Sequence, residues 1–475
     1  LVFGTSVRDV ATHPAVRAGV SRQSVFDYLY FHMVPSPATV YSGVEKLRPA
    51  HCLVHENGRT SVRSYWMPEF AVSNDSAPDA LHEELRSVLR QAVARATTLP
   101  GEVAAFLSGG LDSSTVAGML ASLSSTPART FSIGFEAEEY NELGFARIAA
   151  RRFGLDSFEL EVNPADVTEA MPALAAAFDE PFGNSSAVPA YWCARAARER
   201  GITHLLAGDG GDELFGGNKH YTRQAVFELY SRIPGVVRRG LCEGLLLRAI
   251  PEEAPFPLGK LRSYIDQARI PLPRRLQSWD FMFRTPAARV FDPAFLASIS
   301  GTHPDDVMAS VYQEPDTDDY VNRLLYLDWQ FVMADSDLRK VNGACALAGV
   351  DVSYPMLDAD VVDFSLRLPS RMKVRGQQLR PFYKDAMRGF LPDEILDKEK
   401  HGFGLPFGLW LKTDPGLRSL VHDSLSVLKR RGIVRADFLD DLVREHQGGH
   451  ASYYGYAIYD LVMLEQWLSA HRASV

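Results

Sequence analysis

Between residues 103 and 207, short apolar segments alternate with longer segments whose apolar residues recur at helical spacing. This alternation constrains the fold more than any other feature, because strands that alternate with helices of about 10–15 residues form βαβ units and a parallel sheet. We therefore expect an α/β fold with a parallel twisted sheet flanked by helices. The expected strands are Val103–Leu107, Arg129–Phe135, Ser157–Val162 and Thr203–Ala207, and the expected helices are 79–97, Ser113–Leu123, Asn141–Phe153 and Ala187–Arg200.

The chain on either side of this region has a different character. Residues 1–66 favour short strands and turns, and the Asn-Gly pair at 57–58 suits the positive φ of a hairpin turn. Short strands are expected at Leu1–Gly4 and Cys52–His55, and a helix around Ser24–His32. From about residue 221 onward the pattern is mostly helical, as in Asp318–Met333, Asp358–Leu368 and Tyr456–Leu468.

The stretch Pro68–Pro78 is polar and bounded by prolines, which is typical of a linker. We therefore expect a first domain at residues 1–66, a linker at 67–78 and a second domain at 79–475. The chain begins at Leu1 without an initiator methionine, so we expect a fragment or a processed product of a longer protein.

Charge and composition exclude several classes of protein. The 50 Lys and Arg residues are outnumbered by 59 Asp and Glu residues, and this net charge of −9 argues against nucleic acid as the main partner. No apolar stretch approaches the roughly 20 residues that cross a bilayer, so no membrane partner is expected. The cysteines are scattered without a CxxC pair, which argues against a zinc knuckle or disulfide framework and fits a reducing, cytoplasmic compartment. They are Cys52, Cys193, Cys242 and Cys345.

The sequence SGGLDSS at residues 108–114 lies between an expected strand and an expected helix. Glycines let backbone N–H groups approach an anion closely, and the N-terminus of a helix attracts negative charge. Asp112 would repel a phosphate unless a bound Mg²⁺ lay between them, so the sequence predicts a pyrophosphate loop with a metal. It is not a Walker loop, because the chain has no GxxxxGK[ST] sequence. The alternative is a plain Ser/Gly turn with Asp112 or Ser113 as helix N-cap.

A second loop, AGDGGDELFGG at residues 207–217, follows the expected strand Thr203–Ala207. Asp209, Asp212 and Glu213 place three carboxylates within five residues, and such groups repel one another unless a cation or donor is present. Loops at the carboxyl ends of parallel strands converge on one crevice, so the two loops should face each other. The alternative interpretation is a solvated acidic turn.

SGGLDSS followed by GDGGDELFGG resembles the synthetase domain of the glutamine-dependent asparagine synthetases, which belong to the adenine-nucleotide α-hydrolase superfamily. Residues 1–66 resemble the end of the glutaminase domain of that family, and YPMLD at 354–358 and KEKHGFGLPFGLWL at 398–411 also match. The resemblance implies an adenine-nucleotide α-hydrolase-like sheet with a largely helical C-terminal part. It also implies a preceding partial β-rich glutaminase domain of the N-terminal nucleophile type.

The resemblance implies specific roles for residues of both loops. Asp112 and Asp212 match the carboxylates that bind Mg²⁺, and Asp209 matches an acidic residue that assists the amine step. Lys400 matches a lysine that neutralises charge on the phosphates, although spacing alone does not separate it from Lys398. The residues that match the ATP site are Leu107, Ser108, Gly109, Gly110, Leu111, Asp112, Ser113, Ser114, Ile133, Ala207 and Gly208.

The reaction that the resemblance implies joins aspartate to glutamine-derived ammonia. The carboxylate attacks the α-phosphate of ATP to form an acyl-adenylate and pyrophosphate, and ammonia then displaces AMP. The implied partners are small molecules, with a homodimer as a further expectation. The family's N-terminal nucleophilic cysteine has no match here, since Cys52 is internal and is expected to be a buried core thiol. We therefore expect a missing upstream segment.

The chain departs from the family near the carboxylate substrate. Asn342-Gly343 replaces an acidic-basic pair, Ser353-Tyr354 replaces a sequence with a basic residue, and Val7 stands where a Glu is usual. Lost basic residues weaken the case for a dicarboxylic substrate, because its second carboxylate needs a positive partner. The cations that could compensate are Arg339, Lys340, Arg380 and Lys384.

Two alternative functions follow from these departures. One is a related ligase that amidates or cyclises a sugar, peptide or secondary-metabolite carboxylate, as the β-lactam synthetases and lasso-peptide cyclases do. The β-lactam synthetases tend to carry Tyr at the position of Asp209, which counts against that branch. The other is a catalytically silent ATP-binding scaffold, against which the intact Asp112, Asp212 and Lys400 argue.

Overall fold

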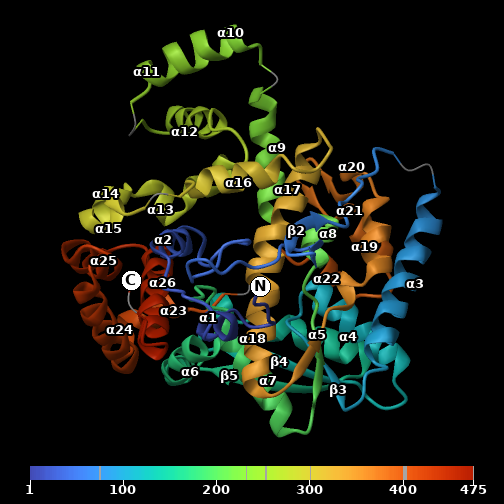
Figure 1. Ribbon diagram of the computed structural model, residues 1–475. Coiled ribbons are helices and arrows are strands. Elements are labelled where there is room, and N and C mark those ends of the chain that lie inside the picture. Colours follow the sequence, from blue (N-terminus) through green and yellow to red (C-terminus); the bar gives the residue numbers. More distant parts are fainter. Residues whose placement is uncertain (74–75, 232, 252–253, 300, 400–403, 474) are drawn as a thin grey trace.

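The largest sheet of the described residues is parallel and has five strands, and part of it lies in the lower part of Figure 1. The computed structural model describes residues 1–475 except 74–75, 232, 252–253, 300, 400–403 and 474. The strand order is β5-β4-β3-β6-β7, and all neighbouring strands of this sheet are parallel, which confirms the α/β prediction. The strands are β3 (Val103–Phe106), β4 (Arg129–Phe135), β5 (Asp156–Val162), β6 (His204–Leu206) and β7 (Asp351–Ser353). β7 was not predicted, because three residues carry no recognisable period.

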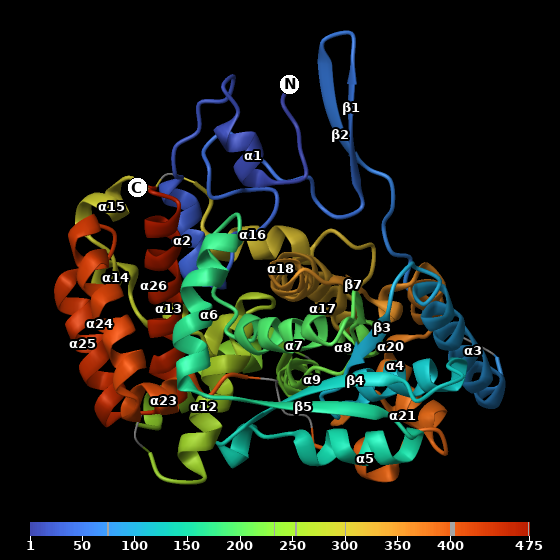
Figure 2. The same ribbon diagram turned by 90° about the horizontal axis from the view of Figure 1, so that it is seen from below.

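Helices cover both faces of this sheet, and consecutive residues of one strand therefore enter different cores. Ala104 of β3 belongs to the core beneath α6 and α7, whereas Ala105 belongs to the core beneath α3, α4 and α5. Figure 2 shows α5 and α7 on opposite sides of β4 and β5. The helices are α3 (Pro78–Ala96), α4 (Leu111–Leu123), α5 (Leu143–Phe153), α6 (Pro164–Ala177) and α7 (Ala187–Glu199).

The expected helices of this region are present with small shifts at their ends. α4 begins at Leu111 rather than Ser113, and Gly110 is its N-cap. α5 ends at Phe153, as predicted, and the following Gly154 takes φ +64° as a left-handed C-cap. α6 was not predicted, although Asn163 and Asp166 form a capping box at its start.

Residues 1–66 contribute two helices and one hairpin. The hairpin pairs β1 (His51–Glu56) with β2 (Arg59–Ser64) through Asn57 and Gly58, both at positive φ, as the sequence predicted. It projects away from the body (Figure 2), so Cys52 is only half-buried and the expectation of a core thiol was wrong. The strand expected at Leu1–Gly4 is also absent from the described residues. The helices are α1 (Val7–Thr12) and α2 (Arg22–Phe31).

Residues 67–78, apart from 74 and 75, connect the hairpin to α3 without a helix or strand before Pro78. This segment is nevertheless packed on the body, since Phe70 lies against Trp329 at a ring distance of 5.7 Å. The Ala71 amide also donates a hydrogen bond to the Leu366 carbonyl at 3.0 Å.

The C-terminal half is mostly helical, as predicted. α17 (Tyr320–Asp328) continues through a π-helical stretch, Trp329–Asp337, into α18 (Leu338–Ala348), which packs against α7. Among the described residues, no helix combines the length and apolarity that a membrane crossing needs. The other helices are α8 (Gly211–Phe215), α9 (Lys219–Ser231), α10 (Gly235–Val237), α11 (Leu247–Ala249), α12 (Leu258–Ala268), α13 (Phe281–Arg284), α14 (Ala287–Val290), α15 (Pro293–Ala297), α16 (Pro304–Tyr312), α19 (Ala359–Leu366), α20 (Ser370–Lys373), α21 (Pro381–Met387), α22 (Asp393–Leu396), α23 (Phe407–Thr413), α24 (Pro415–Leu428), α25 (Ala436–Gly448) and α26 (Ala451–Ala470).

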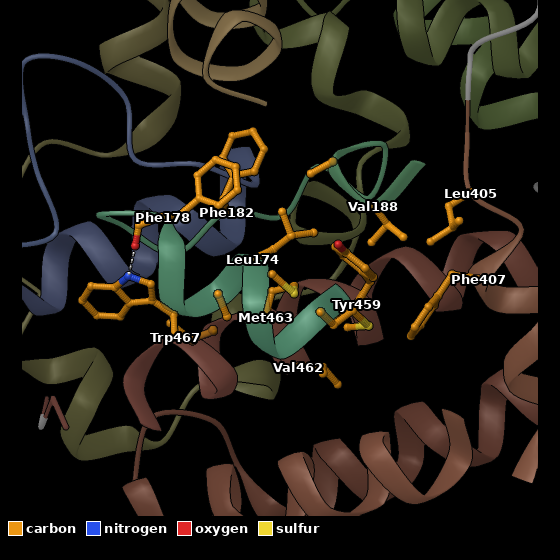
Figure 3. Close-up of a cluster of buried hydrophobic side chains, with 14 of the residues drawn as sticks. Leu174, Phe178, Phe182, Val188, Leu405, Phe407, Tyr459, Val462, Met463 and Trp467 are labelled. Carbon is orange, nitrogen blue, oxygen red and sulfur yellow. Dashed lines mark hydrogen bonds between the residues drawn. The ribbon is translucent and has the colours of Figure 1, made fainter. Parts of the chain in front are cut away.

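The C-terminal helix α26 is anchored to the sheet domain by aromatic packing (Figure 3). The Trp467 indole is fully buried and donates a hydrogen bond to the Phe178 carbonyl at 3.1 Å. The Phe178 ring stacks on Phe182 at 4.8 Å and also fills the space beside Gly343 of α18, where an added Cβ would lie 2.5 Å from the ring. Gly343 therefore fits this packing, and a residue with a side chain would not.

Candidate active site

A cavity of about 1020 Å³ lies at the carboxyl ends of the central strands. The loop after β3 and the loop after β6 both line it, together with α18, α21 and the hairpin of β8 (Val374–Arg375) and β9 (Gln378–Leu379). The structure thus brings together two loops that are about 95 residues apart, as the sequence predicted. The predicted ATP-site residues that line the cavity are Leu107, Ser108, Gly110, Leu111, Asp112, Ser113, Ile133 and Gly208.

The first loop leaves the N-terminus of α4 facing the cavity. Its N-cap is Gly110, which has no side chain to accept a hydrogen bond from the helix, so the predicted alternative with Asp112 or Ser113 as N-cap is not found. The Ser108 and Ser113 hydroxyl oxygens lie 2.9 Å apart, and the Gly110 amide donates to the Ser108 hydroxyl at 3.3 Å. The first amide groups of a helix have no partner within the helix itself, and together with two adjacent hydroxyls they form a cradle suited to phosphate oxygens.

Three of the predicted ATP-site residues do not line the cavity. An added Cβ at Gly109, whose φ is +71°, would lie 2.3 Å from the Ala146 amide nitrogen, so this glycine permits close packing on α5. Ser114 is buried within α4, and Ala207 is buried with its amide donating to the Ser353 carbonyl at 2.9 Å. Gly109, Ser114 and Ala207 therefore help to hold the two loops in place without lining the cavity.

The two predicted metal carboxylates, Asp112 and Asp212, converge on one guanidinium. The Nη1 and Nη2 atoms of Arg380 lie 2.7 and 2.5 Å from the two Asp112 oxygens, and Nη1 also lies 3.0 Å from Asp212 Oδ1. Within the described part of the chain, no three His, Cys, Asp or Glu residues group as metal ligands. A Mg²⁺ here would therefore take two carboxylates and complete its octahedron with phosphate oxygens and water, which is its usual manner of binding.

Asp209 lies at the other end of the loop, next to Lys340 of α18. The Lys340 ammonium is 3.7 Å from Asp209 Oδ1 and 2.9 Å from Asp337 Oδ1. Burial raises the pKa of the Asp209 carboxyl, and the neighbouring Lys340 charge opposes that rise. Burial disfavours the charged form of Lys340, but Asp337 and Asp209 together hold its pKa above its ordinary value. Lys340 therefore stays charged.

The sequence left Lys398 and Lys400 as candidates for binding the phosphates. Lys400 lies outside the described residues. Lys398 lines the cavity, where its ammonium is 2.8 Å from Glu142 Oε1 and 3.5 Å from the Gly109 carbonyl oxygen. Its stem passes the Phe145 ring, with the ammonium 4.4 Å from the ring centroid. Lys398 therefore holds the loop against α5.

Two of the residues that were expected to depart from the family, Tyr354 and Asn342, pair with each other, and a third, Ser353, pairs with His204. The Tyr354 hydroxyl donates to Asn342 Oδ1 at 2.9 Å, and Ser353 Oγ lies 2.9 Å from His204 Nε2. Burial raises the pKa of the Tyr354 phenol, and Asp209 adds to the rise, so this hydroxyl stays neutral beside the carboxylate. The Tyr354–Asn342 hydrogen bond therefore joins two neutral groups.

The four cations that were expected to compensate have different surroundings. Arg339 lies 2.9 Å from the fully buried Glu180 and faces the Phe182 ring, and it does not line the cavity. Lys384 lines the cavity close to Arg380 and Arg388, where burial lowers the pKa of its ammonium and both guanidiniums lower it further against the pull of Asp397. Among the described residues, Lys340 is therefore the cation within 4.0 Å of Asp209.

Comparison with known proteins gives matches across most of the chain. The model of the asparagine synthase family matches residues 84–469, and the model of a glutamine amidotransferase domain matches residues 1–66. Asparagine synthetase [glutamine-hydrolyzing] 1 of Bacillus subtilis is 24% identical over 431 residues, which cover 90% of this chain and 65% of that protein. A putative asparagine synthetase of Mycobacterium tuberculosis is 28% identical over 404 residues, covering 83% of this chain and 59% of the relative. The chain therefore spans less than two thirds of the length of these relatives.

Proposed function

This chain belongs to the asparagine synthase family, and on that premise we propose that it is an ATP-dependent ligase that converts a carboxylate into an amide through an acyl-adenylate. The observation that carries the proposal is the convergence of the two loops on one cavity, with Asp112 and Asp212 held at a common point. A silent scaffold would not need the carboxylates, the helix N-terminus and Asp209 in one chamber.

The chain's own residues suit the first half of such a reaction. The amide groups at the start of α4 and the hydroxyls of Ser108 and Ser113 would bind the β- and γ-phosphates of ATP. Asp112 and Asp212 fit Mg²⁺, since they already share a cation, and the metal would neutralise charge on the departing pyrophosphate. The substrate carboxylate then attacks the α-phosphorus, the bond to the pyrophosphate oxygen breaks, and the acyl-adenylate forms.

The second half takes place beside Asp209. Ammonia attacks the acyl carbon, a proton leaves the nitrogen, and AMP departs with the electrons of the broken C–O bond. Asp209 would accept that proton, because burial raises the pKa of its carboxyl toward the range in which a carboxylate acts as a base. Lys340 would keep Asp209 ionised and oriented through its 3.7 Å contact. Lys400 remains our candidate for binding phosphate oxygens.

The identity of the carboxylate substrate and the source of the ammonia are more specific proposals. Aspartate and glutamine-derived ammonia are the first candidates, because the curated relatives carry the names of glutamine-hydrolysing asparagine synthetases. The match of residues 1–66 to a glutamine amidotransferase domain agrees with glutamine as the source. A homodimer stays a prediction.

One observation favours a second candidate substrate. Aspartate has a second carboxylate that needs a positive partner, but Lys340, which among the described residues is the cation within 4.0 Å of Asp209, is already paired with Asp337 and Asp209. The second candidate is therefore a carboxylate without a second negative charge close to the reacting carboxyl group. Its amidation would use the same acyl-adenylate chemistry.

Release of pyrophosphate with ATP, ammonia and a panel of carboxylates tests the proposal. We expect release that depends on one carboxylate class, and its loss in Asp112→Asn but not in the exposed control Asp423→Asn. Release with aspartate alone would select asparagine synthesis, and release with another acid would select the second candidate. A folded protein that neither binds ATP nor releases pyrophosphate with any acid would refute the ligase and leave the scaffold.

A further inference from the structure

Arg380 occupies the point where the metal carboxylates meet. Its side chain is 4% exposed and contacts both oxygens of Asp112 and one oxygen of Asp212. The Tyr383 ring lies beneath it, with the guanidinium carbon 4.1 Å from the ring centroid. The sequence suggested Arg380 only as a compensating cation for the substrate, so this position is a finding of the structure.

The surrounding backbone is shaped to accept this arrangement. An added Cβ at Gly211 would lie 2.1 Å from Asp112 Oδ1, and one at Gly217 would lie 1.8 Å from Asp212 Oδ1 and 2.9 Å from Arg380 Cδ. Arg380 itself takes φ +57°, which is costly for a residue with a side chain. Its amide donates to the Lys373 carbonyl at 2.8 Å, and this bond helps to hold the strained conformation. The missing Cβ atoms and the backbone conformation of Arg380 therefore both favour its contacts with the two carboxylates.

Resting on the nucleotide site proposed above, we propose that Arg380 occupies the metal position in the nucleotide-free protein and makes metal binding conditional on nucleotide. A guanidinium and a divalent cation compete for the same carboxylate oxygens. While Arg380 holds them, an approaching cation loses ligands and also meets a positive charge a few ångströms away.

A bound nucleotide would offer the Arg380 guanidinium another anion, so that it could release the two carboxylates. Its Nε atom is buried and has no hydrogen-bond partner among the described residues. A guanidinium carries five N–H donors that match phosphate oxygens, so the phosphates of a bound nucleotide offer it an alternative anion in the same cavity. The exchange keeps the local charge balanced, because the carboxylates gain a metal as they release the guanidinium. Arg380 thus orders binding so that metal enters with the nucleotide.

The direct test is the binding of Mn²⁺, as a spectroscopic substitute for Mg²⁺, to nucleotide-free protein. Measured by the paramagnetic resonance of free Mn²⁺, the unsubstituted protein should bind weakly. Arg380→Met should bind about tenfold more tightly or better, and adding Asp112→Asn should abolish the gain. Equal Mn²⁺ affinity of folded Arg380→Met and unsubstituted protein would overturn the proposal.

A matched control separates competition from general charge effects. Arg388 lines the same cavity and pairs with Asp385 instead of the metal carboxylates, so Arg388→Met removes one positive charge without freeing Asp112. We expect no gain in Mn²⁺ affinity for this variant. A gain equal to that of Arg380→Met would mean that long-range charge alone controls the metal, which contradicts the proposal.

Arg380→Met leaves two buried carboxylates without their guanidinium, so its stability must be measured as well. We expect a lower melting temperature that Mg²⁺ restores, whereas Mg²⁺ should leave the unsubstituted protein unchanged. If Arg380→Met does not fold, Arg380→Lys replaces it, and its single ammonium should permit an intermediate gain in Mn²⁺ affinity. A folded Arg380→Lys protein without that gain would overturn the proposal. These measurements use neither a carboxylate substrate nor ammonia, so their outcome is independent of the ligase reaction.

Discussion

At the phosphate end of the cavity, formed by Ser108, Ser113, Asp112, Asp212 and Arg380, the backbone does most of the positioning. Gly211 and Gly217 leave room for the two carboxylates, and the N-terminus of α4 supplies the anion cradle. At the acyl end, formed by Asp209, Lys340 and Asp337, positioning depends on a few side-chain contacts.

This difference indicates which part of the cavity can accept substitutions. A side chain can be replaced without moving the chain, whereas a cradle made of amides and missing Cβ atoms cannot tolerate substitution. The phosphate end carries the SGGLDSS sequence on which the resemblance rests, whereas Asn342, one of the expected departures, pairs with Tyr354, whose phenol is influenced by Asp209 of the acyl end. Under the proposed function, the backbone would position the nucleotide and side chains would select the substrate.

The largest expected effect comes from a substitution that disturbs the backbone at the phosphate end of the cavity. In Gly211→Ala the added methyl group would meet the Asp112 carboxylate, so we expect a loss of pyrophosphate release of about 100-fold or more from the displaced group. The control Gly144→Ala, where nothing lies within 4 Å of the added Cβ, should remain active. If both variants keep full activity, the backbone does not position this end.

The next effect concerns the acyl end and has a pH signature. Lys340→Met removes the charge that opposes the raised pKa of Asp209, so that pKa should rise further. Because Asp209 accepts a proton only when ionised, the acidic limb of the pH–rate profile for amide formation should move to higher pH. The rate near neutral pH should fall by about 10- to 100-fold.

ATP binding separates this variant from the previous one. Lys340→Met should bind ATP nearly as well as the unsubstituted protein, whereas Gly211→Ala should bind it poorly. A pH–rate profile that does not move, measured under single-turnover conditions, would contradict the role of Asp209 as the base.

The smallest effect tests the departure from the family. Asn342→Ala removes the 2.9 Å hydrogen bond from Tyr354 and leaves every charge at the acyl end in place. We expect the KM for the carboxylate to change by about fivefold and kcat to change less, since one neutral hydrogen bond is worth about 1 kcal/mol. A 100-fold loss in kcat would show that Asn342 takes part in the chemistry itself.

Much of the sheet domain could be predicted from sequence because its signals are local. The alternation of strands and helices, the Asn57-Gly58 turn and the glycine that ends α5 each act within a few residues. Local signals fail where the structure depends on distant contacts. β7 is three residues long and forms only by pairing with β6, and Cys52 is only half-buried because its hairpin has no covering layer among the described residues.

In the candidate site, too, the features set by local sequence were predicted and those set by distant contacts were not. Both loops were predicted from their own sequences, but the contact of Arg380 with Asp112 joins residues 268 positions apart, and no motif marks it. The engagement of Arg339 by Glu180 is likewise a tertiary contact that composition and spacing cannot reveal. Lys400 and the boundaries of the linker stay predictions.

The most direct measurement follows oxygen from the carboxylate into the products. With a carboxylate substrate labelled with heavy oxygen, attack on the α-phosphorus transfers one labelled oxygen to AMP when ammonia displaces it. The account predicts labelled AMP and unlabelled pyrophosphate in equal amounts with the amide. Label in inorganic phosphate, with ADP as the nucleotide product, would show attack at the γ-phosphorus and would contradict the acyl-adenylate reaction proposed for this cavity.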